Sequence, residues 1–270
     1  MIHTKRKPPP FLRQRFLLDL IDNLESILTQ DLMRLCFLQD ETSEHYHFVP
    51  TPDGPHSFTL ENDLAWLEKR GFIVINDEQI KPQREVQYVK EGAHYLPQAR
   101  GEALFELVIQ RETYKKFNVK SVDASNLLAT IGYEGQSIDG FMTTLLKNGI
   151  RVLCDIRANP RSMKFGFSQK KLEEISNLLG MIYAHIPQLG IETKTRKLYL
   201  GDGKNHYKAL FDDYREHLND KVPYLDTLYE LLIKHKRLAI VCFEKDPQMC
   251  HRSIVSNYVS ETHQIKTIDL

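Results

Sequence analysis

From Leu127 to Leu270, short aliphatic segments alternate with stretches of helical periodicity, and this alternation constrains the fold more than any other feature. The expected strands lie at 127–131, 151–156, 181–186, 238–243 and 266–270. The expected helices lie between them, at 137–147, 169–179, 207–218, 223–235 and 250–262. Aliphatic strands separated by helices are typical of a parallel sheet buried on both sides. The sequence therefore predicts an α/β domain over residues 125–270, with a mostly parallel sheet and helices on both faces.

The first third of the chain predicts a smaller unit of another architecture. Apolar residues at helical spacing over 11–37 predict two helices, the second of them capped by Thr29. A short strand at 46–50, a helix over 57–71 that stops at Gly71, and a tight hairpin over 72–80 follow. This order predicts a winged-helix-like α+β module over residues 1–95. Residues 96–124 are expected to form a connector with one helix at 102–117.

Charge and cysteine content restrict the classes of partner and compartment. The 36 Lys and Arg residues balance the 36 Asp and Glu residues, so any contact with nucleic acid requires a local basic patch. The four cysteines lack the paired short spacings of a zinc site or a disulfide framework, and metal spacings such as HExxH are absent. No segment approaches the length of a membrane span. We therefore expect a cytoplasmic protein without metal, other cofactor or membrane contact.

Polar side chains gather where the predicted strands end. In open α/β sheets ligands bind at the carboxyl ends of the strands, where loops and helix N-termini converge. Asp155 and Arg157 are two residues apart at the end of a strand, so their side chains point to the same face. Such a pair either orients Arg157 toward an anionic ligand or neutralises itself.

The candidate ligand-binding residues share this position near strand ends, and their arginines suit phosphate or carboxylate: Gly132, Tyr133, Glu134, Arg157, Arg161 and Arg252. The candidate catalytic residues are Asp155, Glu244, Cys250 and His251. Asp155 and Glu244 are candidates for general acid–base or orienting groups. Cys250 is expected to open a helix, where the dipole lowers a thiol pKa. The alternative is that Cys250 packs as a small apolar residue while His251 and Arg252 cap the helix.

Four motifs in this order resemble the domain-of-unknown-function family DUF488 over roughly Leu127 to the C-terminus. They are Thr130-Ile131-Gly132-Tyr133-Glu134-Gly135, Asp155-Ile156-Arg157 with Pro160-Arg161-Ser162, Tyr183 with Pro187 and Leu189-Gly190, and Cys242-Phe243-Glu244 through Cys250-His251-Arg252. The family pattern includes a glycine-bearing first strand end, Asp-x-Arg, and Cys-x-Glu leading to Cys-His-Arg. That family has no settled activity, so the resemblance implies a fold and a site but no reaction.

The N-terminal segment resembles the Panacea (SocA-like) domain of antitoxin and phage-related proteins. The residues that carry this resemblance are Tyr46-His47-Phe48-Val49-Pro50, Gly54-Pro55, Ser57-Phe58, Asp63-Leu64, Leu67 and Gly71-Phe72. By association alone, it implies binding of DNA or of a partner protein.

Three hypotheses of function follow. The leading one is an enzyme that performs a hydrolytic or base-directed step on nucleic acid or a nucleotide, with the winged module locating the substrate. The second is a non-enzymatic regulator or phage-defence-associated binding protein; acidic residues on the 57–71 helix favour a protein partner over DNA. The third is cysteine-centred sulfur or redox chemistry, which requires an exposed Cys250 of low pKa. Cys242, inside an apolar strand, is expected not to pair with Cys250.

Overall fold

The computed structural model describes residues 8–39, 45–83, 98–115, 125–201 and 206–270. The chain divides into two compact units, residues 1–118 and 119–270. The predicted boundary at 95/96 lies outside the described residues, and the predicted boundary at 124/125 lies at the start of a described range. Within the described ranges, no helix combines the length and the apolar character needed to cross a membrane.

The N-terminal unit is a small α+β structure, as predicted. Its helices and strands are α1 (Leu12–Asp22), β1 (Ile27–Leu28), α2 (Thr29–Gln39), β2 (Val49–Thr51), β3 (Gly54–His56), α3 (Phe58–Lys69), β4 (Ile73–Asn76) and β5 (Gln79–Pro82). The strands form two antiparallel sheets, one in the order β1-β5-β4 and one from β2 and β3.

Local signals explain most of these bounds. Ser57 caps α3, because its hydroxyl oxygen accepts a hydrogen bond from the Leu60 amide at 3.3 Å. Thr29 is the first residue of α2, and its hydroxyl donates to the Glu78 carbonyl oxygen at 3.0 Å, so its predicted capping role is wrong. The predicted connector helix is divided into α4 (Gly101–Ile109) and α5 (Glu112–Lys115). The α4 helix packs on α2 and so belongs to this unit.

The C-terminal unit is built on one five-stranded parallel sheet, which confirms the predicted α/β class. Its strands are β6 (Leu127–Gly132), β7 (Val152–Asp155), β8 (Ile182–His185), β9 (Arg237–Cys242) and β10 (Thr267–Asp269). They lie in the order β10-β6-β9-β7-β8, and every neighbouring pair is parallel. The long strand β9 therefore lies between β6 and β7, and their carboxyl ends meet at one edge.

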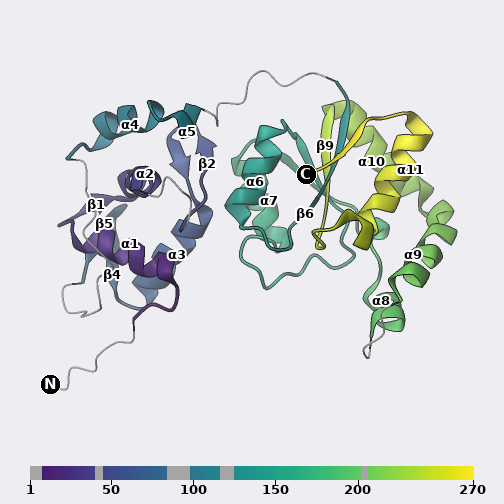
Figure 1. Ribbon diagram of the computed structural model, residues 1–270, viewed down its shortest axis with the longest axis horizontal. Helices are drawn as coiled ribbons and strands as arrows, with labels where there is room; N and C mark the ends of the chain where they lie inside the picture. The colour runs from purple at the N-terminus through teal and green to yellow at the C-terminus, as the bar shows by residue number, and fades with distance from the viewer. Residues whose placement is uncertain (1–7, 40–44, 84–97, 116–124, 202–205) are drawn as a thin grey trace. The chain divides into compact units, whose positions relative to one another are not determined.

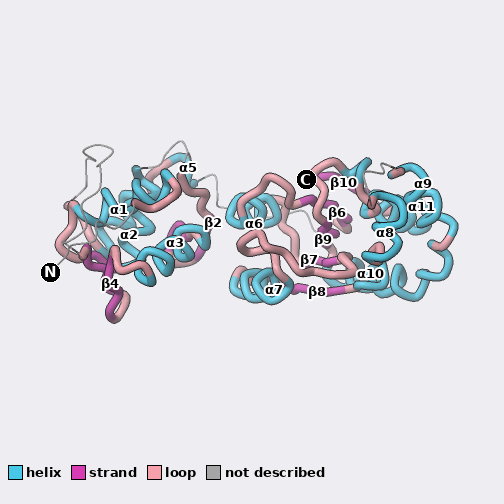
Figure 2. Tube along the Cα trace, turned by 90° about the horizontal axis from the view of Figure 1, so that it is seen from below, coloured by secondary structure: helices cyan, strands magenta, loops and turns pink. Residues whose placement is uncertain are grey.

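Helices surround this sheet. They are α6 (Ile138–Lys147), α7 (Gln169–Leu178), α8 (Thr193–Leu200), α9 (Tyr207–Glu216), α10 (Val222–His235) and α11 (Arg252–His263), with 3₁₀ turns η1 (Pro187–Leu189), η2 (Leu218–Lys221) and η3 (Pro247–Met249). Figures 1 and 2 show α6 and α7 on one side of the sheet and α10 and α11 on the other. Apolar side chains of α10 and α11 form one core with Leu238 and Ile240 of β9.

Two features of this unit differ from the sequence prediction. The α8 helix was not predicted, because none of its residues is buried and it carries no apolar stripe. The last helix begins at Arg252 and not at Cys250, since Cys250 has extended backbone angles (φ −140°, ψ 137°) after η3. Cys250 therefore precedes the helix, and the predicted effect of the helix dipole on it does not apply as stated.

Candidate functional site

A cavity of about 550 Å³ lies at the carboxyl edge of the sheet. Three residues of the predicted ligand site, Tyr133, Arg157 and Arg161, line it, and so does His251 of the predicted catalytic set. The remaining walls include Arg196 and Lys197 of α8, together with Cys242 and Phe243 at the end of β9. The order of the strands explains this convergence, since β9 lies directly between the strands that lead to Tyr133 and to Arg157.

Asp155 and Arg157 form the ion pair that their spacing allowed. The Arg157 Nη2 and the Asp155 Oδ2 are 2.5 Å apart, and the Arg157 Nε donates to Asp155 Oδ1 at 2.8 Å. The Tyr183 hydroxyl also donates to the Asp155 carboxylate, at 2.7 Å. The Arg157 Nη1 donates to the Tyr133 hydroxyl oxygen and to the Phe167 carbonyl oxygen, both at 2.9 Å. This network fixes the Arg157 guanidinium in the cavity wall and satisfies the buried Asp155 carboxylate.

Arg252 is buried away from the cavity surface, with 1% of its surface exposed. Its guanidinium donates to the carbonyl oxygens of Glu244 and Lys245 and to the Thr130 hydroxyl oxygen. A guanidinium whose donors meet protein acceptors in this way is not presented to a ligand. The prediction that Arg252 contacts a ligand is therefore wrong. Arg252 instead holds the loop that follows β9.

Gly132 and Glu134 hold the same loop from the other side. A Cβ atom at position 132 would lie 1.8 Å from the Glu244 carbonyl oxygen, so only glycine permits this approach. The Glu134 carboxylate accepts a hydrogen bond from the Lys245 amide at 3.0 Å. Neither residue is among those that line the cavity, in contrast to their predicted contact with a ligand.

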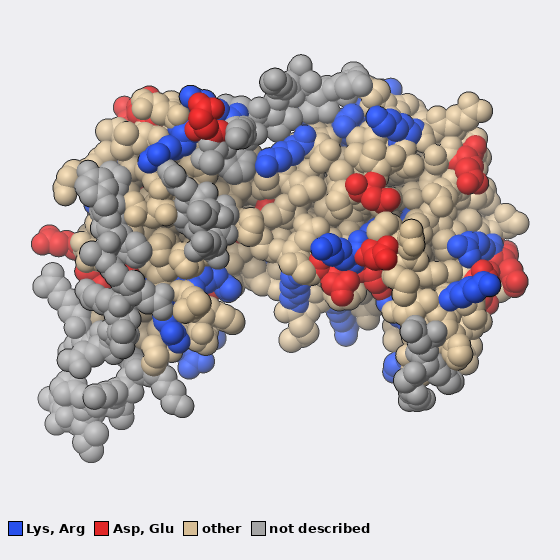
Figure 3. Space-filling view, viewed as in Figure 1, with Lys and Arg blue, Asp and Glu red and all other residues tan. Residues whose placement is uncertain are grey.

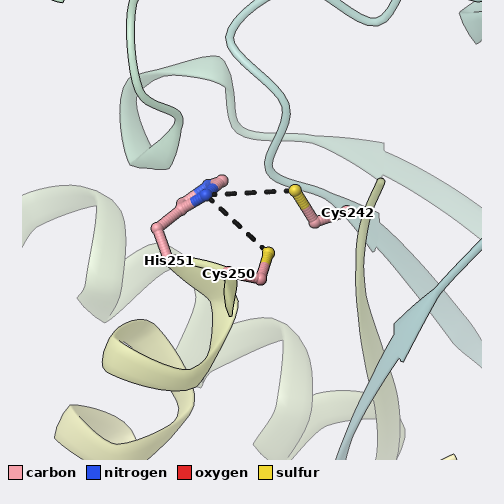
Figure 4. Close-up of side chains that lie close together, drawn as sticks. All are labelled: Cys242, Cys250 and His251. Carbon is pink, nitrogen blue, oxygen red and sulfur yellow. Dashed lines mark hydrogen bonds between the residues drawn. The ribbon is translucent and has the colours of Figure 1, made fainter. Parts of the chain in front are cut away.

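Cys242, Cys250 and His251 come together at the base of this edge. Figure 4 shows their side chains converging from the end of β9 and from the turn before α11. The His251 Nδ1 is 3.9 Å from the Cys242 Sγ and 4.0 Å from the Cys250 Sγ. Cys242 thus lies beside Cys250, although its place in an apolar strand predicted that the two would not pair. All four cysteines are free and buried.

The two thiols have opposite pKa shifts. Burial acts to raise the pKa of Cys250, but hydrogen bonds from Cys242 and His251 and the charge of His251 outweigh it and lower this pKa to about 5. The hydrogen bond to Cys250, burial and the negative charge of Cys250 all raise the pKa of Cys242. Cys250 is therefore the more acidic of the two thiols.

Glu244 joins this group through Cys242 and Arg196. Its Oε2 is 3.4 Å from the Cys242 Sγ, and its Oε1 forms an ion pair with the Arg196 Nη2. Burial acts to raise the pKa of Glu244, but the Arg196 charge and hydrogen bond outweigh it and lower this pKa. Glu244 is therefore an ionised carboxylate beside the two thiols.

Arg196, Lys197 and Cys242 were missed by the sequence analysis. The two cations lie on α8, which carries no apolar periodicity that would have revealed a helix. Cys242 was interpreted as an apolar strand residue. The period of two places it on the same face of β9 as Leu238 and Ile240, the face that packs on α11, and this signal could have placed it near Cys250.

Comparison with known proteins gives one match. Residues 137–259 match the family model described as "Domain of unknown function DUF488". This match supports the predicted resemblance of the C-terminal unit. The matched region begins just before α6, includes β7, β8 and β9, and ends within α11. It therefore covers the Asp155-to-Arg157 motif and the Cys242-to-Arg252 motif. No curated protein and no solved structure matches the chain. The Panacea resemblance of the N-terminal unit stays a prediction.

Proposed function

We propose that the DUF488-like unit is an enzyme that acts on a nucleotide or on nucleic acid, with the 550 Å³ cavity as its substrate site. The observation that carries this proposal is that cations and an exposed aromatic ring line the same cavity as Cys242 and His251. Phosphate and a nucleobase together require both kinds of contact.

Arg161 and Lys197 supply the phosphate contacts. Both line the cavity, and across the described residues neither has a carboxylate partner within ion-pair distance. Arg157 and Arg196 add positive charge nearby, although each is paired with a carboxylate. Figure 3 shows blue and red side chains intermingled on the part of the surface that it draws in colour.

Phe243 supplies the surface on which a base stacks. Its side chain is 43% exposed and lines the cavity, where it meets the Tyr133 ring edge-to-face with centroids 5.3 Å apart. Tyr133 is in turn stacked on Phe167, at 4.4 Å between centroids, so the wall behind Phe243 is rigid. A planar base on an exposed aromatic ring gains stacking energy without sequence preference.

The chemistry we propose is a hydrolytic or base-directed step. Cys242 and His251 lie at the cavity, and the ionised Glu244 lies beside Cys242, where a carboxylate can accept a proton. A thiol nucleophile is less well supported, because Cys250 is 1% exposed and is not among the residues that line the cavity.

For the N-terminal unit we propose a winged-helix module that binds a partner or locates the substrate. The order α1-β1-α2-β2-β3-α3-β4-β5 keeps the helices and the final hairpin of a winged helix, with the β2-β3 hairpin inserted between α2 and α3. The β1-β5-β4 sheet also supports this interpretation. Exposed Glu61 and Glu68 on α3 accompany Lys69, so this helix suits a protein partner better than a DNA groove.

The test is binding of fluorescent nucleoside mono- and triphosphates and of a short single-stranded oligonucleotide to the full chain. The Arg161→Ala/Lys197→Ala double variant removes the two cavity cations that have no carboxylate partner among the described residues. Lys170→Ala/Lys171→Ala removes two exposed lysines of α7 as a control. We expect the first double variant to weaken oligonucleotide binding and to reduce the slope of log K against log salt by roughly 0.7 for each phosphate that it no longer neutralises. Mass spectrometry of the incubated ligands then identifies the reaction. Equal binding by both double variants would contradict the proposed substrate site.

A further inference from the structure

The Cys242, Cys250 and His251 group has the donor set and the spacing of a metal site. The Sγ atoms of the two cysteines and a ring nitrogen of His251 all lie within 4.8 Å of one another. Each residue is at most 4% exposed, so the group is shielded from bulk water. Figure 4 shows the three side chains directed toward a common point.

The distances are close to those of a tetrahedral zinc ion. Zn–S bonds of about 2.3 Å and Zn–N bonds of about 2.0 Å place sulfur and nitrogen ligands roughly 3.6 Å apart in a tetrahedral site. The two measured Sγ–Nδ1 distances are 3.9 and 4.0 Å. A contraction of a few tenths of an ångström brings both Sγ–Nδ1 distances to the tetrahedral value. The two Sγ atoms, which lie within 4.8 Å of each other, have to come to about 3.8 Å by rotation of the cysteine side chains.

The nature of the ligand atoms selects the metal. Two sulfurs and one imidazole nitrogen suit zinc and exclude magnesium and calcium, which require oxygen ligands. Binding through Nδ1 leaves the ring proton on Nε2. That atom is buried and lacks a hydrogen-bond partner among the described residues.

The turn that carries the ligands is held in place before any metal binds. The Asp246 side chain caps η3 by accepting a hydrogen bond from the Gln248 amide at 2.8 Å. Arg252 and Glu134 hold the main chain at Glu244 and Lys245. The loop between Cys242 and Cys250 therefore keeps the two sulfurs close together, which lowers the entropy cost of binding.

We propose that Cys242, Cys250 and His251 bind a zinc ion through both Sγ atoms and Nδ1, with release of whatever proton each thiol still carries. Three protein ligands leave a fourth position open, as in catalytic zinc sites. Cys242 and His251 line the cavity, so this position is on the cavity side, and Glu244 lies next to it without being required as a ligand. Zinc binding does not depend on which substrate the cavity takes.

The first experiment measures zinc in tag-free full-length protein, grown with zinc, purified under reductant and dialysed, by inductively coupled plasma mass spectrometry. We expect one zinc per chain in the wild type and a loss of at least tenfold in both Cys242→Ala and Cys250→Ala. Cys154→Ala is the matched control, because Cys154 is equally buried in the neighbouring strand β7 but is not part of the group. It is expected to keep its zinc.

The second experiment needs no variant and so remains informative if a cysteine variant fails to fold. Apo protein titrated with Co²⁺ is expected to develop thiolate-to-cobalt charge-transfer absorption and the intense visible bands of a tetrahedral site. Absence of these bands, together with a zinc-free wild type, would overturn the proposal. So would isolation, without reductant but with zinc present, of a zinc-free chain in which peptide mapping finds a Cys242–Cys250 disulfide. If zinc is absent but nucleotides still bind, the zinc inference alone fails.

Discussion

Gly132 lies so close to Glu244 that a Cβ atom at position 132 would come within 1.8 Å of the Glu244 carbonyl oxygen. This contact joins the end of β6 to the loop after β9, and that loop carries Phe243 and Glu244 and leads to Cys250. The approach of two main chains at this point therefore determines where the candidate site residues lie.

Gly132→Ala is expected to displace this loop. The added methyl group meets main chain, which cannot rotate away, so we expect a decrease of about 1 to 3 kcal/mol in the free energy of unfolding. We also expect lower zinc content and weaker nucleotide binding. The measurement is urea denaturation together with both binding assays. Gly135→Ala is the control: a Cβ there meets nothing within 4 Å, and its cost comes from the backbone angle φ of +77°. If Gly132→Ala binds zinc and nucleotide like the wild type, the loop does not depend on this contact.

Arg252→Met is expected to destabilise the loop that follows β9. The substitution keeps an unbranched side chain but leaves the Glu244 and Lys245 carbonyl oxygens without the guanidinium donors that Arg252 supplies. Loss of buried hydrogen bonds of this kind costs about 3 kcal/mol in the free energy of unfolding. Arg215→Met provides the comparison, because Arg215 is exposed on α9 and its removal is expected to change this free energy by about 0.5 kcal/mol or less. Similar stabilities of the two variants would show that Arg252 does not hold the loop.

Asp155→Asn tests the ion pair with Arg157. Both side chains are buried, so removing the carboxylate charge leaves the guanidinium without a counter-charge, at a cost of about 3 to 5 kcal/mol in unfolding free energy. Asp212→Asn, which removes the partner of exposed Arg215, serves as the control and is expected to cost under about 1 kcal/mol. Chemical denaturation measures both. An equal, small effect at the two positions would mean that the Arg157 charge is balanced by other groups.

The sheet was predictable from the composition of its strands. Leu127–Gly132 and Arg237–Cys242 consist mainly of buried aliphatic residues between segments of helical period, a pattern that parallel strands covered on both faces produce. The ion pair of Asp155 and Arg157 was also within reach, since the period of two in a strand fixes which side chains share a face.

The residues around the two thiols were harder to predict, because tertiary contacts and not the local sequence bring them together. Arg196 lies on a helix that has no buried residue and so no apolar period. Arg252 has the sequence signature of an anion-binding residue, yet the loop after β9 folds over it and uses its donors. Spacing along the chain also hid the metal-ligand group: Cys242 and Cys250 are separated by a loop whose path depends on Gly132 and Glu134.

Phe243→Ala tests whether a base stacks in the cavity. The ring is 43% exposed, so its removal is expected to change the unfolding free energy by under about 1 kcal/mol. Stacking of a base on an aromatic ring contributes about 1 to 3 kcal/mol, so the dissociation constant of a nucleoside monophosphate is expected to rise at least about fivefold.

Two comparisons make this result specific to stacking on Phe243. Leu178→Ala removes a similarly exposed apolar side chain on α7, 67% exposed and outside the cavity lining, and is expected to leave nucleotide affinity unchanged. Ribose 5-phosphate has the phosphate but no base, so its affinity is expected to be the same in the wild type and in Phe243→Ala. Isothermal calorimetry with both ligands measures these constants. A Phe243→Ala variant that loses affinity for ribose 5-phosphate as well would show that the ring shapes the phosphate site and not a base platform.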